Sequence, residues 1–600
     1  MQKIIEKNYK IIILILLSFI FVVSVLNAGN DSLIYDEAAH IPAGYSYLVA
    51  HDMRLNPEHP PLLKDLSALP LLFIQPKFDI AADFWTKDNA DASQWNAGKS
   101  FLFASGNNAD QIIFWSRLPI ILISLLLGFF IFKWTRELAG VTAGIFALTL
   151  YSFDPNILGH NHFVTTDIGI AAFITFAFYY FLRFIKEPTK KNVFLAGIFL
   201  GLVQLVKFSS VLAFPVFGLI ILLYPLIKMH GHKSRLHCLG EYLAKGFLVF
   251  LISFVVVYVF YFFNTYQMPQ EKLPEIINHY FKPYDTRPIN VYAREALFWM
   301  NGREALMPMA DYLFGVARVF QRVAGGNITY FLGEISTQGF LSYFPVIFLI
   351  KEPLSLIFLI VFSLAISIFA IIKTTINEPR KIIHFIHYLR TQVIEFSMLL
   401  FIAIYASTSI TGRLNIGLRH LLPIFPFIYI LVSIGIFRFI RKTHHINKYI
   451  VYTILIATLG ILISGTLSSY PYYTSYFNSL GGGPTQGYKF ATDSNADWGQ
   501  DLKRLKIFLE AHPEITKIKI DYFGMADLDY YIPGRYEKWW ASKRPIEPGW
   551  YAISALFLQE GIYDQKKSDS ESYRWLKNKK PLYQVGTSIL IYHIVPQKDK

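Results

Sequence analysis

The chain carries two adjacent carboxylates shortly after its first apolar run. They are Asp36 and Glu37, and the run covers residues 11–28. An aspartate at the start of a helix caps free backbone amides, so a purely structural explanation of the pair exists. A carboxylate just outside a membrane helix also suits a general base, which takes a proton from a hydroxyl or amine attacking an electrophilic carbon. Adjacent carboxylates also raise each other's proton affinity.

A second acidic element, Asn56-Pro-Glu58-His59-Pro-Pro61, follows in the same loop. Its prolines restrict the backbone, so Glu58 and His59 are presented on a stiff segment. They could be ordinary surface residues, or they could bind a divalent metal ion together with nearby histidines. The spacing matches no closed zinc motif. We therefore give Glu58 and His59 only as tentative ligands of a divalent metal ion. No other cofactor is predicted.

A third carboxylate, Asp167, stands at the start of a later apolar run in Thr165-Thr-Asp167. An ionised group at membrane depth costs about 2.5 to 3.5 kcal/mol on insertion scales. Asp167 could simply occupy the first turn of a helix that a threonine caps. If it faces a cavity instead, it joins the carboxylates of the first loop.

Repeated long apolar runs place the chain among polytopic membrane proteins. Of its residues, 54% are hydrophobic and 16% are charged. A span needs about 20 apolar residues, and we predict about eleven transmembrane helices on this basis. They begin near residues 11, 112, 138, 167, 193, 209, 245, 353, 394, 421 and 449. The first run lacks a small-residue cleavage site, and we interpret it as a retained span.

The basic residues predict the orientation of the spans. They gather in alternate connecting loops, for example Lys186, Lys190 and Lys191 in one and Arg438, Arg441 and Lys442 in another. Such loops lie on the cytoplasmic side, which accounts for the net charge of +14 without a nucleic-acid partner. The N-terminus is then cytoplasmic, and outer loops 29–110 and 266–343 lie on the opposite face. The single cysteine, Cys238, excludes an intramolecular disulfide.

Several basic residues depart from this charge trend because they fall on the outer side. A lone lysine or arginine there can reach outer headgroups. As a set, they favour an anion bound at the outer membrane surface, and arginine in particular suits phosphate through paired donors. A lipid-linked phosphate is such an anion. The predicted phosphate-binding residues are Lys207, Lys351, Arg413 and Arg419.

The composition changes after residue 467, where tyrosine, glycine, proline and charged residues replace the apolar run. We therefore divide the chain into a transmembrane catalytic module, 1–467, and an extracytoplasmic α/β domain, 468–600. Periodicity predicts a helix over 502–509 and strands over 518–522, 550–556 and 588–594. No internal repeat is visible.

These residues together resemble the GT-C class of membrane glycosyltransferases, specifically the superfamily of protein O-mannosyltransferases and aminoarabinose transferases. The resemblance rests on four stretches of the membrane module and two of the outer domain. They are Tyr35-Asp36-Glu37, Asn56-Pro-Glu58-His-Pro-Pro-Leu62, Thr165-Thr-Asp167, Arg419-His-Leu-Leu-Pro-Ile-Phe-Pro426, Tyr476-Phe-Asn-Ser-Leu-Gly-Gly-Gly-Pro484 and Asp493-Ser-Asn-Ala-Asp-Trp-Gly-Gln-Asp-Leu502. The last two are similar to bacterial phospholipid carrier-dependent glycosyltransferases.

The resemblance implies a mainly α, GT-C-like fold and a polyprenyl-phosphate-linked sugar donor. It implies catalytic roles for Asp36, as the base, for Glu37 beside it, and for Asp167. It also implies a metal-associated position at Glu58 and transfer on the non-cytoplasmic face. The expected setting is a bacterial plasma membrane. Displacement of the phosphate by an activated hydroxyl predicts inversion of the anomeric centre.

The acceptor stays open among a glycan, a lipid and a protein. A multispan transporter of an anionic or lipid-linked substrate is the alternative from another functional class. Transporters commonly show repeated halves and polar residues at the bilayer midplane. Here the polar residues gather at the outer ends of the spans, which favours the enzyme.

Overall fold

The computed structural model describes residues 2–228, 234–376, 381–443, 445–540 and 546–595. Within these ranges, nine helices are long and apolar enough to cross a membrane. The fold is mainly α and polytopic, as the sequence predicts. The elements that contain these spans are α1 (Gln2–Asn30), α7 (Ala109–Ala139), α10 (Asp167–Lys186), α12 (Ala213–Ile227), α13 (Arg235–Thr265), α18 (Leu354–Ile376), α20 (Val393–Thr411), η4 (Leu418–Ile424) with α21 (Phe425–Lys442), and α22 (His445–Ser468).

All eleven apolar runs form helices, but two of these helices are short. They are α8 (Val141–Ser152) and α11 (Lys190–Gln204). α11 packs closely against α13 because it presents glycines there: a Cβ at Gly197 or Gly201 would lie 2.6 Å from the Cβ of Ile252 or Val256. Small residues allow such close helix contacts in membranes. An apolar run therefore predicts that a helix forms, but not that this helix is long enough to cross the membrane.

The first outer loop folds into short helices. They are α2 (Glu37–Ala50), α3 (Leu62–Ala68), α4 (Leu71–Ile74), α5 (Asp83–Thr86) and α6 (Ala90–Lys99). The apolar spacing of 34–50 suggests a helix lying along an interface, but residues 37–47 of α2 are all buried. Built Cβ atoms at Gly44 and Gly98 would lie 2.2 and 2.3 Å from the carbonyl oxygens of Lys64 and Ala38, so α2 is clamped between α3 and α6.

The second outer segment forms three helices and a hairpin before the next span. The helices are α14 (Lys272–Tyr280), α15 (Pro288–Asn301) and α16 (Met307–Gly325). The antiparallel hairpin pairs β1 (Thr329–Phe331) with β2 (Glu334–Ser336). Further connecting helices are α9 (Pro155–His160), α17 (Tyr343–Lys351) and α19 (Lys381–Thr391).

The C-terminal region contains a five-stranded mixed sheet in the order β4-β3-β5-β7-β6. β3 pairs in parallel with β4 and β5, and β7 is antiparallel to β5 and β6. The predicted helix and three strands are present as α23, β3, β5 and β7. The elements are α23 (Leu502–Ala511), β3 (Ile518–Asp521), α24 (Leu528–Tyr531), β4 (Tyr536–Lys538), β5 (Gly549–Ser554), α25 (Ala555–Tyr563), β6 (Tyr583–Val585) and β7 (Ile589–Ile594).

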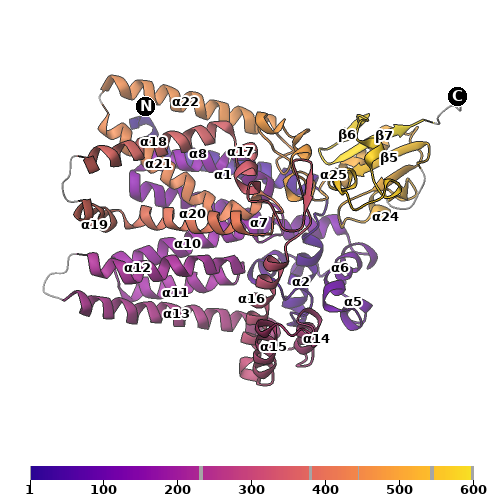
Figure 1. Ribbon diagram of the computed structural model, residues 1–600, viewed down its shortest axis with the longest axis horizontal. Coiled ribbons are helices and arrows are strands. Elements are labelled where there is room, and N and C mark those ends of the chain that lie inside the picture. The colour runs from indigo at the N-terminus through magenta and orange to yellow at the C-terminus, as the bar shows by residue number, and fades with distance from the viewer. Residues whose placement is uncertain (1, 229–233, 377–380, 444, 541–545, 596–600) are drawn as a thin grey trace.

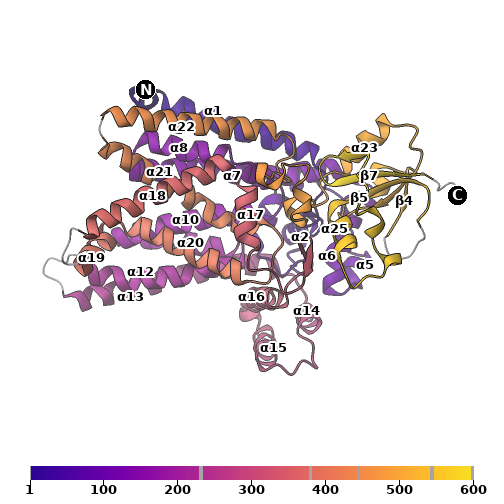
Figure 2. The same cartoon turned by 45° about the horizontal axis from the view of Figure 1, so that its top comes forward.

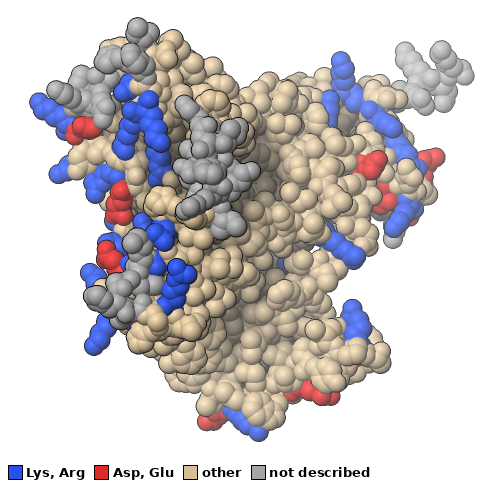
Figure 3. Space-filling model, turned by 60° about the vertical axis from the view of Figure 1, so that its left-hand side comes forward, with Lys and Arg blue, Asp and Glu red and all other residues tan. Residues whose placement is uncertain are grey.

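The sheet lies beyond one end of the helix bundle, and the N-terminus lies at the other end (Figure 1). The helices of both outer segments cluster at the end that carries the sheet, and a second view shows the same arrangement (Figure 2). Many lysine and arginine side chains gather on the opposite end of the bundle, and others lie with acidic side chains on the part that carries the sheet (Figure 3). The two ends therefore differ in structure.

Candidate active site

Four charged residues from distant parts of the chain form one connected cluster at the junction of the bundle and the outer elements. Arg419 of η4 donates through Nη1 to Asp36 Oδ2 at 2.8 Å and to Asp167 Oδ2 at 3.2 Å. Lys207, just before the 3-10 helix η2 (Phe208–Leu212), donates to Asp167 Oδ1 at 2.7 Å. Two carboxylates and two cations thus meet in one place.

The two carboxylates differ in their access to solvent. The side chain of Asp36 is 27% exposed, whereas that of Asp167 is 1% exposed. Asp167 is therefore suited to hold Arg419 and Lys207 in place, and Asp36 can meet a substrate. Within the described chain, Asp36 stands at the N-cap position of α2 without a side-chain capping bond. The capping explanation of Asp36 is therefore not supported.

Glu37 lies in a separate, fully buried ion pair. Its carboxylate accepts two hydrogen bonds from the guanidinium of Arg117 in α7, at 2.8 and 2.6 Å. It also accepts hydrogen bonds from the backbone amides of Ile34 and Val164. Arg117 also donates to the carbonyls of residues 28, 31 and 32. Both oxygens of Glu37 accept bonds from protein groups, which favours a structural role, and its catalytic role stays an untested prediction. Glu37 holds the segment that presents Asp36.

Replacing Glu37 by glutamine is expected to act mainly by lowering the stability of the folded protein, not by removing a group that takes part in sugar transfer. The change leaves the Arg117 guanidinium buried without its counter-charge, which costs about 3 to 5 kcal/mol for a broken buried pair. The thermal midpoint of the purified protein should fall clearly. In the double variant Glu37→Leu/Arg117→Met, which removes both charges, part of the loss should be recovered. A Glu37→Gln protein of unchanged stability but no activity would contradict this structural role.

Lys351 and Arg413 lie outside the charged cluster. The ammonium of Lys351 is buried, donates to the carbonyls of Thr474 and Asn495 at 3.1 and 2.7 Å, and lies 4.5 Å from the ring centre of Phe477. It joins α17 to the C-terminal region, which favours a structural role, and its role in phosphate binding stays an untested prediction. Arg413 is exposed and donates to the carbonyl of Ala324. Its role in donor binding stays a prediction.

Glu58 is surrounded by arginines that the sequence did not connect to it. Arg322 of α16 lies 2.9 Å from Oε1, and Arg318 lies 3.5 Å from Oε2. His59 Nε2 is 3.9 Å from Glu58 Oε1, and burial lowers the pKa of His59 well below its usual value. Across the described ranges, no group of three or more His, Cys, Asp or Glu side chains could hold a metal ion. Two guanidinium partners suit Glu58 poorly as a ligand, so the residues do not fit the tentative metal site.

The C-terminal region supplies one wall of the cluster. Arg419 Nε donates to Ser494 Oγ at 3.0 Å, and its guanidinium lies 4.2 Å from the ring centre of Trp498. The carbonyl of Trp498 accepts the amide of Tyr35, the neighbour of Asp36. Asp493 has a left-handed φ of +55°, and burial raises its pKa to about 6 against the opposing charge of Arg419. Sequence reasoning noticed this motif but assigned none of its residues to the site.

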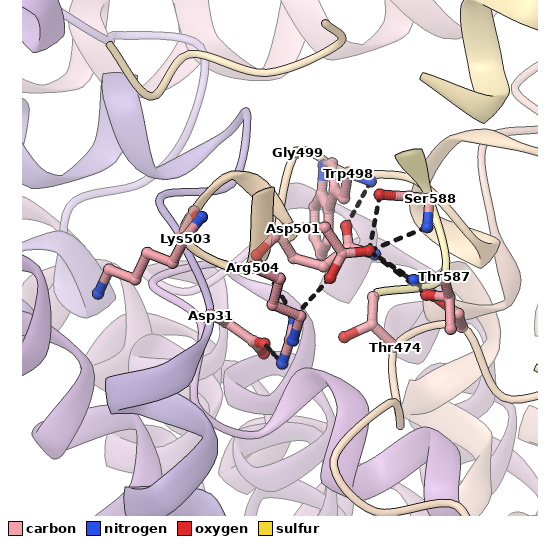
Figure 4. A network of polar contacts seen from close by, with 12 residues as sticks. Asp31, Thr474, Trp498, Gly499, Asp501, Lys503, Arg504, Thr587 and Ser588 are labelled. Carbon is pink, nitrogen blue, oxygen red and sulfur yellow. Dashed lines mark hydrogen bonds and ion pairs between the residues drawn. The ribbon is translucent and has the colours of Figure 1, made fainter. Parts of the chain in front are cut away.

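A polar network fastens this wall to the end of α1 (Figure 4). Arg504 donates to Asp31 at 2.6 Å and to Asp501 at 2.5 Å. Asp501 also accepts the amides of Thr587 and Ser588, each at 2.9 Å. Burial opposes ionisation of Asp31, but the charge of Arg504 and the bond from His162 outweigh it and lower the pKa of Asp31 to about 2. Since Asp31 lies five residues before Asp36, these contacts tie the C-terminal region to the segment that carries Asp36.

The chain is similar to known proteins in part of its sequence and in its fold. A family model described as dolichyl-phosphate-mannose-protein mannosyltransferase matches residues 104–260, which include Asp167 and Lys207. The chain is also similar in fold to the S. cerevisiae protein O-mannosyltransferase Pmt1-Pmt2 complex bound to the sugar donor. The TM-score is 0.54, with 11% identity over 77% of this chain and 90% of that chain. The chain therefore shares the fold of a membrane-bound protein O-mannosyltransferase.

Two further solved glycosyltransferases are similar to this chain at lower TM-scores. ArnT from Cupriavidus metallidurans bound to undecaprenyl phosphate has a TM-score of 0.46 and 12% identity over 97% of this chain and 98% of that chain. The Archaeoglobus fulgidus oligosaccharyltransferase AglB, in complex with an inhibitory peptide and a dolichol-phosphate, has a TM-score of 0.45 and 11% identity over 99% and 75%. No curated protein matches the chain by sequence.

Proposed function

We propose that this protein is a membrane glycosyltransferase that moves a sugar from a polyprenyl-phosphate carrier to an acceptor hydroxyl or amine. The observation that carries the proposal is the accessible carboxylate of Asp36, bound to an arginine that Asp167, Ser494 and Trp498 hold in place. The acceptor is a glycan, a lipid or a protein. Asp36 is the base in this proposal, and Lys207 and Arg419 bind the donor phosphate.

The proposed reaction is a single displacement at the anomeric carbon. The acceptor oxygen or nitrogen forms a bond to that carbon as the bond from the carbon to the phosphate oxygen breaks, and polyprenyl phosphate leaves. The acceptor proton passes to Asp36. Cations placed at the leaving phosphate stabilise the charge that develops on it. Arg419 and Lys207 are positioned to supply this stabilisation.

The ion pair between Asp36 and Arg419 gives the donor a way to free the base. When a donor phosphate competes for Arg419, the Asp36 carboxylate is released from part of this pairing and can turn to the acceptor proton. In this scheme, donor binding precedes proton removal from the acceptor.

We also propose that transfer takes place on the non-cytoplasmic face of a bacterial plasma membrane. The cluster lies at the end of the bundle that carries the sheet, while the basic loops lie at the other end (Figures 1 and 3). Basic loops remain preferentially on the cytoplasmic side. The N-terminus is cytoplasmic under this proposal.

Product stereochemistry tests the single displacement. Purified enzyme in lipid nanodiscs is given polyprenyl-phosphate mannose, labelled with ¹³C at the anomeric carbon, and a membrane extract as acceptor source. One displacement inverts the anomeric centre, so the one-bond carbon–proton coupling of the product should report the configuration opposite to that of the donor. Retained configuration would overturn the single displacement by Asp36. Hydrolysis of the donor without any glycosylated product would count against the transferase proposal itself.

A further inference from the structure

A cavity of about 600 Å³ opens between α1, α8, α21 and α22. It lies at the end of the bundle remote from the sheet, where these helices meet (Figure 1). Arg441 lines it, and Arg419 stands 22 residues earlier on the same helical span, about 30 Å away at the rise of a helix. The cavity is therefore separate from the catalytic cluster.

Two cations line this cavity at the join between α7 and α8. Arg441 donates from Nη2 to the carbonyl of Ala139, the last residue of α7. A Cβ at Gly140 would lie 2.9 Å from the same nitrogen, and Gly140 has a φ of +89°, so glycine at this join lets the guanidinium approach. Lys448 of α22 makes no hydrogen bond or ion pair with the described residues. Its ammonium is available to a ligand.

The start of α8 adds hydrogen-bond donors to the same wall. The first amides of a helix have no partner within the helix, and their dipoles favour an anion. The N-cap residue of α8 is Gly140, which offers no side-chain acceptor, and Val141 and Thr142 line the cavity. Thr142 Oγ1 is also buried without a partner among the described residues. Glu6 is the acidic side chain in the lining, against the two cations.

Most of the remaining lining is apolar, and part of it is exposed at the surface of α22. Phe437 and Ile440 come from α21, and Tyr452 and Ile456 come from α22, of which Ile456 is 55% exposed. A free phosphate ion would gain nothing from these side chains, whereas acyl chains would cover them. Basic pockets between transmembrane helices bind anionic headgroups. We propose that this cavity binds an anionic phospholipid, with its phosphate at Arg441, Lys448 and the start of α8.

Lipid preference of the purified full-length enzyme tests this proposal. In detergent micelles, native mass spectrometry measures the affinity for phosphatidylglycerol and for phosphatidylcholine of the same chain length. Phosphatidylglycerol should bind at least about tenfold more tightly, given two cations near the headgroup. The variant Arg441→Gln/Lys448→Gln should lose this preference. Because Arg441 also contacts Ala139, the single variant Lys448→Gln, which removes no contact within the described chain, should show part of the loss.

The matched control is Lys190→Gln/Lys191→Gln, which removes two exposed cations at the start of α11, outside the cavity. It should keep the preference for phosphatidylglycerol. Equal affinity for the two lipids, or a preference that survives Arg441→Gln/Lys448→Gln, would overturn the proposal. Inorganic phosphate that displaces bound phosphatidylglycerol at equal concentration would also overturn it, since the site would then hold a free anion.

Discussion

Replacing Asp36 by asparagine is expected to reduce sugar transfer by about 10²- to 10⁴-fold, the range that a positioned general base contributes. Asparagine keeps the size of the side chain but cannot take the acceptor proton. Among the charged residues of the cluster, Asp36 has the most exposed side chain, so the fold should tolerate the change. The rate is measured as loss of radiolabelled polyprenyl-phosphate mannose into product, with enzyme in nanodiscs and a membrane extract as acceptor source.

The matched control for this variant is Asp83→Asn, in the same outer loop. Asp83, the first residue of α5, has a 69% exposed side chain that pairs with Lys87. The same chemical change there should therefore leave the rate unaltered. The thermal midpoints of both variants should lie near that of the wild type. A folded Asp36→Asn enzyme with the wild-type rate would exclude Asp36 as the base, whatever the acceptor proves to be.

The sequence predicts the fold class well because apolar runs of sufficient length leave few alternatives in a membrane. Their lengths are harder to infer, since close packing decides where a helix ends. α11 shows this: its glycines at 197 and 201 bring it against α13, but hydropathy alone does not tell a 15-residue helix from a full span. In the C-terminal sheet, β3, β5 and β7 show clear apolar patterns, whereas β4 and β6 are three-residue edge strands with little pattern to detect.

For the site too, the sequence pattern identifies some residues, whereas others depend on contacts between residues far apart in the chain. Asp36, Asp167, Lys207 and Arg419 could be chosen because each is a charge at the outer end of an apolar run. The separation of Asp36 from Glu37 could not be derived, because it depends on Arg117, which lies 80 residues further along the chain inside a span. Adjacent carboxylates look equivalent in a sequence, but in a helix start they point in different directions.

Lys351 shows that position along the sequence does not identify a member of the charged cluster. It stands at the end of an apolar run, as Lys207 and Arg419 do, but its ammonium donates to two carbonyls of the C-terminal region. A basic residue near a membrane surface can bind a substrate or a backbone, and the sequence pattern is the same for both. Only the tertiary contacts of such a residue decide between these uses.

Arg419 is the residue whose loss should affect the site most broadly. Its guanidinium contacts Asp36, Asp167 and Ser494 and stacks on Trp498, so one side chain links the base, the buried carboxylate and the outer domain. Arg419→Gln should lower transfer by about 10²- to 10³-fold, as expected for removing a preorganised charge at the leaving group. It should also weaken donor binding, measured by titration with polyprenyl phosphate.

Arg419→Lys separates charge from geometry. Lysine keeps the positive charge but lacks the planar donors that reach two carboxylates and a hydroxyl at once, so recovery should be small. The control Arg287→Gln removes an exposed guanidinium at the start of α15 and should change neither transfer nor binding. If Arg419→Gln bound polyprenyl phosphate as tightly as the wild type but transferred slowly, Arg419 would act by positioning Asp36, and the phosphate site would have to be centred on Lys207. If Arg419→Lys restored full activity, charge alone would suffice and the paired contacts would have no catalytic role.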